Sequence, residues 1–163
     1  MKISRRAMLS GGGLLIFAGF AMPEALRSGR ASARGFPFML SDEQWRKRLS
    51  TRQYAILRKE ATEPPFASPL NNEHRKGVFL CAGCGQRLFS SATKFDSGTG
   101  WPSFWKPLPG AINTGTDRKL GYARTEVHCA RCGGHLGHVF DDGPKPTGKR
   151  YCMNGGAMSF VPA

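Results

Sequence analysis

The sequence predicts a mainly β protein, α+β at its N-terminal end, in which two short helices precede antiparallel β-sheets crosslinked through four cysteines. Short apolar runs separated by Gly, Pro, Asn and Asp fill the chain from Phe66 onward, which is typical of short strands joined by turns. Two helix-start patterns lie before Phe66, and two Cys-x-x-Cys pairs lie after it. A length of 163 residues suits one domain with a short appendage.

Residues 1–33 differ in composition from the rest of the chain. A basic start containing Arg5-Arg6 leads into the apolar, Gly-rich run Gly11–Met22 and then into Ala-Ser-Ala at 31–33. This order is typical of a secretory signal peptide, and the arginine pair resembles a twin-arginine (Tat) signal. We therefore expect export, to a bacterial periplasm, and a single mature domain at 34–163. An uncleaved amphipathic anchor with a fortuitous Arg pair is the alternative.

Two short helices are expected within residues 41–64. Ser41-Asp-Glu-Gln44 and Ser50-Thr-Arg-Gln53 both fit a capping box, and this repeated signal favours two helices over one. The second helix is expected to end at Glu63-Pro64-Pro65, because proline cannot continue the helical hydrogen-bond ladder. Strands are expected at the apolar runs 77–80, 87–89, 121–128, 136–140 and 157–161.

Four of the five cysteines form two similar knuckles, Cys81-Ala-Gly-Cys84 and Cys129-Ala-Arg-Cys132, each followed by glycine. Two intervening residues let one tight turn present both sulfurs to one ion, and glycine permits the positive φ of that turn. Two such turns predict a closed, structural zinc site in which all four ligands are cysteines. The 44 residues between the knuckles exceed the ordinary zinc-ribbon spacing, so the zinc would join two distant β segments. Two disulfides are the alternative, because exported proteins carry them.

The fifth cysteine, Cys152, stands alone in Lys149-Arg-Tyr-Cys-Met-Asn-Gly-Gly156. The thiolate is the nucleophile in thiol chemistry, and neighbouring cations such as Arg150 lower the pKa of a thiol. An unpaired thiol in an exported chain indicates a functional residue, and Asn154 could orient an imidazole or a water beside it. A buried structural cysteine is the alternative.

Two histidines and an aromatic loop are candidates to complete a site around Cys152. His135 and His138 follow the second knuckle directly; one could support the turn while the other donates a proton near neutral pH. They could instead bind a metal, but the four thiolates suffice. The loop Gly98–Trp105 carries Trp101, which either fills the core or forms an apolar pocket for a small group such as a methyl.

Composition excludes several classes of protein. A chain with 40% hydrophobic residues is not wholly disordered, and no apolar run reaches the roughly 20 residues of an ordinary membrane span. The formal net charge of +13 raises nucleic acid as a partner. The basic residues are scattered, however, and export separates the protein from nucleic acid. We therefore predict no nucleic-acid partner, with a zinc-ribbon nucleic-acid binder as the alternative.

Four segments that follow one another along the chain resemble the zinc-containing methionine sulfoxide reductase type B family (MsrB): Glu63-Pro-Pro-Phe-Ala-Ser-Pro-Leu, Lys94-Phe-Asp-Ser-Gly-Thr-Gly-Trp-Pro-Ser-Phe, Gly137-His-Val-Phe and Arg150-Tyr-Cys-Met-Asn. The resemblance covers about residues 38–162. It implies an MsrB/Mss4-like antiparallel β fold with one structural zinc and no organic cofactor. It also implies reduction of the R diastereomer of methionine sulfoxide, mostly within proteins, and we expect a monomer that repairs exported proteins after oxidative stress.

The resemblance also implies roles for residues of this chain. Cys152 is the nucleophile that attacks the sulfoxide sulfur, and His138 matches the position of the acid. Attack builds negative charge on the sulfoxide oxygen, so a proton donor lowers the barrier. Methionine then leaves and Cys152 remains as a sulfenic acid. The other candidates are expected to support the site, His135 and Asn154, or to bind substrate, Trp101, Phe104 and Arg150.

Thr99 departs from the family pattern. Many members carry a resolving cysteine there, and this chain has no other cysteine unless the zinc releases one. We therefore expect an external thiol, from a thioredoxin-like protein or a small molecule, to reduce the Cys152 sulfenic acid directly. A zinc-stabilised module that binds oxidised segments without turnover is a further alternative.

Overall fold

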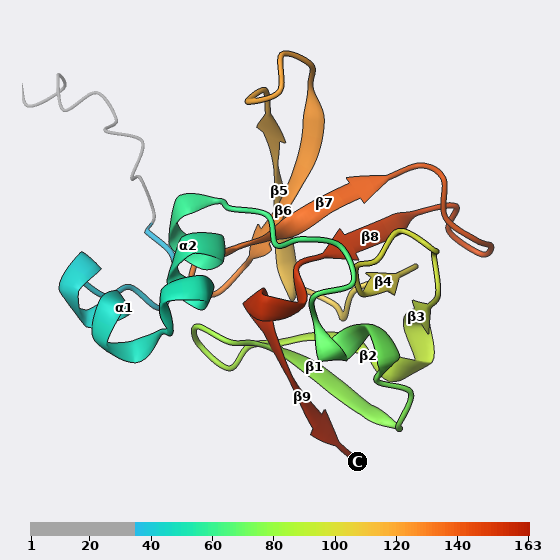
Figure 1. The fold of residues 1–163 in the computed structure, drawn as a ribbon, viewed down its shortest axis with the longest axis horizontal. Helices are drawn as coiled ribbons and strands as arrows, with labels where there is room; N and C mark the ends of the chain where they lie inside the picture. The colour runs from blue at the N-terminus through green and yellow to red at the C-terminus, as the bar shows by residue number, and fades with distance from the viewer. Residues whose placement is uncertain (1–34) are drawn as a thin grey trace, which may run out of the picture. The chain divides into compact units, whose positions relative to one another are not determined.

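Two antiparallel β-sheets form the body of the structure in the computed structural model, which describes residues 35–163 (Figure 1). The smaller sheet has the strand order β2-β1-β9, and the larger has the order β3-β4-β8-β7-β6-β5. Two α-helices precede both sheets in the chain, which confirms the predicted fold class. The predicted signal peptide, 1–33, lies outside the described residues.

The helices are α1 (Asp42–Arg48) and α2 (Thr51–Lys59). The strands are β1 (Gly77–Cys81), β2 (Arg87–Ser90), β3 (Lys94–Phe95), β4 (Ser103–Phe104), β5 (Ile112–Asp117), β6 (Arg124–Cys129), β7 (His135–Phe140), β8 (Arg150–Met153) and β9 (Met158–Pro162). Within residues 35–163, neither helix has the length and apolar character that a membrane span requires.

Both helices begin as predicted. The side chains of Ser41 and Ser50 accept the backbone N–H three residues on, and Gln44 and Gln53 return the bond to the cap, so both capping boxes are complete. The predicted end of α2 is wrong, because the helix stops at Lys59, before the prolines. Glu60 adopts a left-handed conformation with φ of 56° and terminates it.

The apolar runs mark only some of the strands that place the catalytic candidates. They coincide with β1, β2, β6, β7 and β9, whereas β3, β4, β5 and β8 are short or polar and carry no apolar pattern of their own. The pairing of β4 with β8, and of β8 with β7, sets Ser103 beside Cys152 and Cys152 beside His138. These three residues therefore share one face of the larger sheet.

The core lies on the opposite face of that sheet. Phe104 and Met153 alternate with Ser103 and Cys152 along their strands, so they point away from the site and are fully buried. The ring of Phe104 stacks on Phe89, with centroids 4.3 Å apart, and meets Phe79 edge-on at 4.9 Å. This aromatic cluster joins β4 of the larger sheet to β1 and β2 of the smaller sheet.

Candidate active site and metal site

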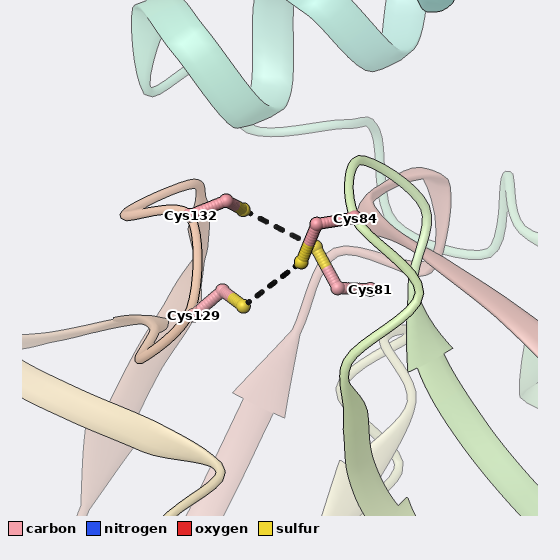
Figure 2. Close-up of side chains that lie close together, drawn as sticks. All are labelled: Cys81, Cys84, Cys129 and Cys132. Atoms are coloured by element: carbon pink, nitrogen blue, oxygen red, sulfur yellow. Dashed lines mark hydrogen bonds between the residues drawn. The ribbon is translucent and has the colours of Figure 1, made fainter. Parts of the chain in front are cut away.

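The four knuckle cysteines converge on one point between the two sheets (Figure 2). Their sulfurs all lie within 4.8 Å of one another, with Cys81 and Cys132 at 3.7 Å and Cys84 and Cys129 at 3.6 Å. A disulfide needs about 2.05 Å, and all four thiols are free. A tetrahedral ion with metal–sulfur bonds of about 2.3 Å holds its sulfurs about 3.8 Å apart. The geometry therefore fits one metal ion and contradicts two disulfides.

The turns that carry these cysteines have the conformation that the glycines predict. Gly85 and Gly133 have φ of 74° and 67°, which residues with a Cβ rarely adopt. Three arginines donate to carbonyl oxygens within the knuckles: Arg48 to Gly83, Arg58 to Cys132 and Arg131 to Cys84. Part of the excess positive charge of the chain thus surrounds a cluster that four thiolates would make negative.

The fifth cysteine lies in a separate place, on β8, where it is half-buried. It lines a cavity of about 120 Å³. The cavity walls come from the segment after α2 (the 60s segment), the 98–105 loop and strands β6, β7 and β8. The residues that line it are Thr62, Trp101, Arg124, Gly137, His138, Phe140, Cys152 and Asn154. The structure thus brings four of the predicted site residues together: Trp101, His138, Cys152 and Asn154.

Trp101 and Asn154 are both held by the backbone of Glu63. The indole N–H of Trp101 donates to the Glu63 carbonyl at 3.0 Å, and the Glu63 N–H donates to Oδ1 of Asn154 at 2.9 Å. The Asn154 amide also donates to the Leu136 carbonyl at 3.2 Å. Asn154 therefore anchors the loop after β8 to β7 and to the 60s segment, with no hydrogen bond to an imidazole among the described residues.

His138 faces Cys152 across the β7–β8 pairing. Its Nε2 donates to Oδ2 of Asp117 at 2.8 Å, because an ionised carboxylate can only accept. The pKa of Asp117 is held below its usual range, first by the backbone N–H of Lys119 and then by the His138 bond. The pKa of His138 is lowered, chiefly because burial disfavours the charged ring, while Asp117 acts in the opposite direction.

His135 lies behind His138 and does not line the cavity. It is 3% exposed, and its Nδ1 lies 2.7 Å from Oε1 of Glu126. The rings of His135 and His138 meet edge-on with centroids 5.4 Å apart. His135 is thus placed to support the ring of His138 by packing rather than to touch a molecule in the cavity.

The structure contradicts the substrate-binding role predicted for Phe104. Its side chain is 0% exposed and belongs to the core, because it alternates with Ser103 on β4.

Arg150 is placed differently: it lies on the same strand face as Cys152, two residues away. Its guanidinium binds Asp142 at 2.7 Å and 2.9 Å and covers the ring of Phe140. Its pKa is raised, first by Asp142 and also by nearby Cys152.

Thr99 lies next to Cys152, with Oγ1 3.8 Å from Sγ. Its hydroxyl is 2.8 Å from that of Ser97, which is 2.7 Å from that of Ser103. Ser103 in turn donates to the Trp101 carbonyl at 3.0 Å. A chain of hydroxyl groups therefore runs from β4 to the thiol. It includes Thr99, at the position where the resemblance leads us to expect a resolving cysteine.

Three residues of the site are not among the candidates that the sequence predicts: Glu63, Asp117 and Arg124. The Glu63 side chain is 1% exposed and binds Arg52 at 2.7 Å and the backbone N–H groups of Gly155 and Gly156. Arg124 donates to Asp117 at 2.5 Å. In the sequence Glu63 marks the expected end of a helix and begins the first of the four segments that resemble the MsrB family. For Asp117 and Arg124 no local pattern exists, because strand pairing alone joins them to His138.

Comparisons with known proteins agree with this geometry. The SelR domain model matches residues 49–162. A protein from Agrobacterium fabrum named peptide methionine sulfoxide reductase MsrB is 54% identical over 123 residues, which cover 75% of this chain and 91% of the relative. Proteins of the same name from Bradyrhizobium diazoefficiens (54% identity; 75% of this chain, 88% of the relative) and Methanosarcina barkeri (52%; 74% and 85%) are similar too. The chain therefore belongs to the MsrB family.

Proposed function

We propose that this protein reduces the R diastereomer of methionine sulfoxide, within proteins, to methionine. The observation that carries this proposal is one small cavity that holds a thiol, Cys152, a histidine, His138, and an indole, Trp101. A volume of about 120 Å³ suits the end of a methionine side chain. The indole face packs against the substrate methyl, because methyl and sulfur groups pack well on aromatic rings.

The reaction transfers one oxygen atom from substrate to enzyme. The Cys152 thiolate attacks the sulfoxide sulfur, and the sulfur–oxygen bond of the substrate breaks as the oxygen moves to Cys152. The substrate sulfur gains two electrons and leaves as the thioether of methionine. The Cys152 sulfur loses two electrons and remains as a sulfenic acid.

The proton for this step comes from His138. Negative charge develops on the sulfoxide oxygen, and protonation of that oxygen weakens its bond to sulfur. His138 lines the cavity next to Cys152 in the sheet. With its Nε2 bound to Asp117, the ring uses its other nitrogen, Nδ1, for proton transfer.

An external thiol restores Cys152. Its attack on the sulfenic acid releases water and forms a mixed disulfide, and a second thiol then releases reduced Cys152 and an oxidised reductant. The four remaining cysteines belong to the metal cluster, and Thr99 occupies the neighbouring position with a hydroxyl. A thioredoxin-like protein or a small thiol is therefore the reductant.

Zinc is the ion that Cys81, Cys84, Cys129 and Cys132 would hold. Four buried thiolates in tetrahedral reach are the usual ligand set of structural zinc. When bound, the ion supplies a crosslink between the β1–β2 turn and the β6–β7 turn and leaves no open coordination position for chemistry.

The Tat-like pattern around Arg5-Arg6 supports export to a periplasm. We propose that the protein acts there as a monomer on oxidised exported proteins.

The test is an assay of the purified protein with each methionine sulfoxide diastereomer in a peptide, first with dithiothreitol and then with candidate protein reductants. We expect turnover of the R form by the wild type and none by Cys152→Ser. Unchanged activity of that variant would remove Cys152 as the nucleophile, and a preference for the S form would contradict the proposed substrate. Binding without turnover by both proteins would favour a binding module instead.

Export is tested separately in cells. Substitution of Arg5 and Arg6 by lysine should retain the protein in the cytoplasm, whereas the wild type should reach the periplasm with an N-terminus near Arg34. Fractionation and N-terminal sequencing measure both outcomes.

A further inference from the structure

His138 receives opposing influences from two charged residues that strand pairing places beside it. Asp117, the last residue of β5, stands opposite Arg124, the first residue of β6, and accepts hydrogen bonds from Arg124 at 2.5 Å and from His138 at 2.8 Å. Asp117 therefore bridges the pair. Its side chain is 10% exposed and that of Arg124 is 18% exposed, so water contributes little to this contact.

We infer that Asp117 is a positioning residue for the reductase reaction: it holds the His138 ring in one orientation and stabilises its protonated form, while Arg124 limits that stabilisation. This inference rests on the proposed function, in which His138 supplies the proton. Asp117 touches neither substrate nor Cys152, and it acts through His138.

The geometry determines which ring nitrogen exchanges protons. Asp117 is ionised and accepts only, so the Nε2–H of His138 is committed to it in both protonation states of the ring. Nδ1 is then the atom that gains and loses the proton. Without Asp117, the neutral ring could place its proton on either nitrogen and could turn within the cavity, and the fraction of rings ready to donate would fall.

Charged and titratable groups face His138 from β5, β6, β7 and β8. Asp117 on β5 favours the imidazolium, while Arg124 on β6 and His135 on β7 oppose it, as does burial of the ring. Glu126 stands opposite His138 in the β6–β7 register, but its carboxylate is engaged with His135. On β8, Cys152 pairs with His138, and Arg150 is bound to Asp142.

The two neighbours consequently have effects of opposite sign. Loss of the Asp117 charge should lower the pKa of His138 further, and loss of the Arg124 charge should raise it, because each removes one of the contributions just named. A purely structural role for both residues predicts something else: both substitutions would reduce activity without moving the pKa in opposite directions.

The experiment compares Asp117→Asn and Arg124→Gln with the wild type, in the full-length protein. Asp141→Asn is the matched control, because Asp141 is 82% exposed on the surface and pairs with Lys149. NMR titration of the histidine side chains measures the pKa of His138. Single-turnover formation of the Cys152 sulfenic acid, without reductant, measures the chemical step across pH.

We expect Asp117→Asn to slow this step about tenfold at pH 7, part of the roughly 10²–10⁴-fold that a positioned acid contributes. The alkaline limb of its pH profile, where the rate falls as His138 loses its proton, should move to lower pH. The pKa of His138 measured by NMR should move with it. Arg124→Gln should move both to higher pH, and Asp141→Asn should move neither. The amide is isosteric with the carboxylate, so Asp117→Asn retains the packing of the site.

The outcomes separate this inference from the proposed function. If His138→Gln forms the sulfenic acid as fast as the wild type, the acid role of His138 fails, and the inference fails with it. If His138→Gln is slow but Asp117→Asn leaves both the pH profile and the His138 titration unchanged, the proposed function stands and the role of Asp117 is overturned. Movement of the limb in the same direction for Asp117→Asn and Arg124→Gln also overturns it.

Discussion

The hydroxyl oxygen of Thr99 lies 3.8 Å from the Sγ atom of Cys152. A cysteine at position 99 would place a second sulfur within reach of the first by a small movement of the 98–105 loop. We therefore expect the residue at position 99 to decide how the oxidised enzyme is restored.

Thr99→Cys should convert the enzyme to one that closes an internal disulfide. After oxidation by substrate, the wild type should carry a Cys152 sulfenic acid that a dimedone probe labels, and the variant should instead carry a disulfide between position 99 and Cys152. Mass spectrometry of both proteins measures this difference. Thr99→Ser, which keeps the hydroxyl, is the control and should be labelled like the wild type. An internal Cys152 disulfide in the oxidised wild type would contradict direct reduction by an external thiol.

Loss of the metal should destabilise the domain as a whole. Cys129→Ser removes one of four buried ligands, so we expect it to cost roughly 4 kcal/mol or more in the free energy of unfolding. Denaturant titration measures this cost, and elemental analysis should find one zinc per chain in the wild type. Cys152→Ser serves as the control and should keep both the zinc and the stability. Equal stability of the two variants would show that the cluster does not hold the fold together.

Glu63→Gln should lose stability and activity together. The carboxylate is 1% exposed and accepts hydrogen bonds from Arg52, whose side chain is 49% exposed, and from two backbone N–H groups. Weakening these hydrogen bonds to a charged group should cost about 1.5–3 kcal/mol. The Glu63 backbone also holds Trp101 and Asn154, so movement of this segment should raise the KM for sulfoxide. Glu43→Gln is the matched control, because Glu43 pairs with Lys47 on the surface. Similar losses in both variants would refute a special role for Glu63.

Phe104→Ala should reduce stability without changing substrate affinity. Removal of a fully buried phenylalanine costs about 3–5 kcal/mol, and the ring of Phe104 does not line the cavity. Thermal unfolding should report the loss, while the KM at a temperature where the variant is folded should match the wild type. Phe66→Ala, at a side chain that is 74% exposed, should leave the stability nearly unchanged. A raised KM for Phe104→Ala with normal stability would restore the binding role that the sequence predicted.

The parts of the fold that could be predicted are those with a local physical cause. Each helix start depends on a serine and a glutamine three residues apart, and each knuckle depends on two cysteines and the glycine after them. Such patterns act within one turn of chain and leave a direct trace in the sequence. The end of α2 was missed because Glu60, with no glycine to mark it, adopts the left-handed conformation.

The cavity around Cys152 depends on strand pairing that no local pattern in the sequence reveals. The β4–β8 register places Ser103 beside Cys152 and turns Phe104 into the core. Ser103 and Phe104 are nevertheless adjacent in one aromatic motif of the sequence. The side of a strand on which a residue lies is decided by its partner strands, because a shift of one residue reverses every side chain.

By itself the sequence determined the chemistry: four cysteines in two knuckles, a fifth that stands alone, and a threonine where a sixth would be expected. Only the tertiary structure decided which groups surround the fifth. It joined Asp117, Arg124 and His138 from three strands and hydrogen-bonded the indole of Trp101 to the Glu63 carbonyl. The physical reason is that residue types carry reactivity, whereas proton affinity and orientation depend on burial and on charges that are close in space but distant in the chain.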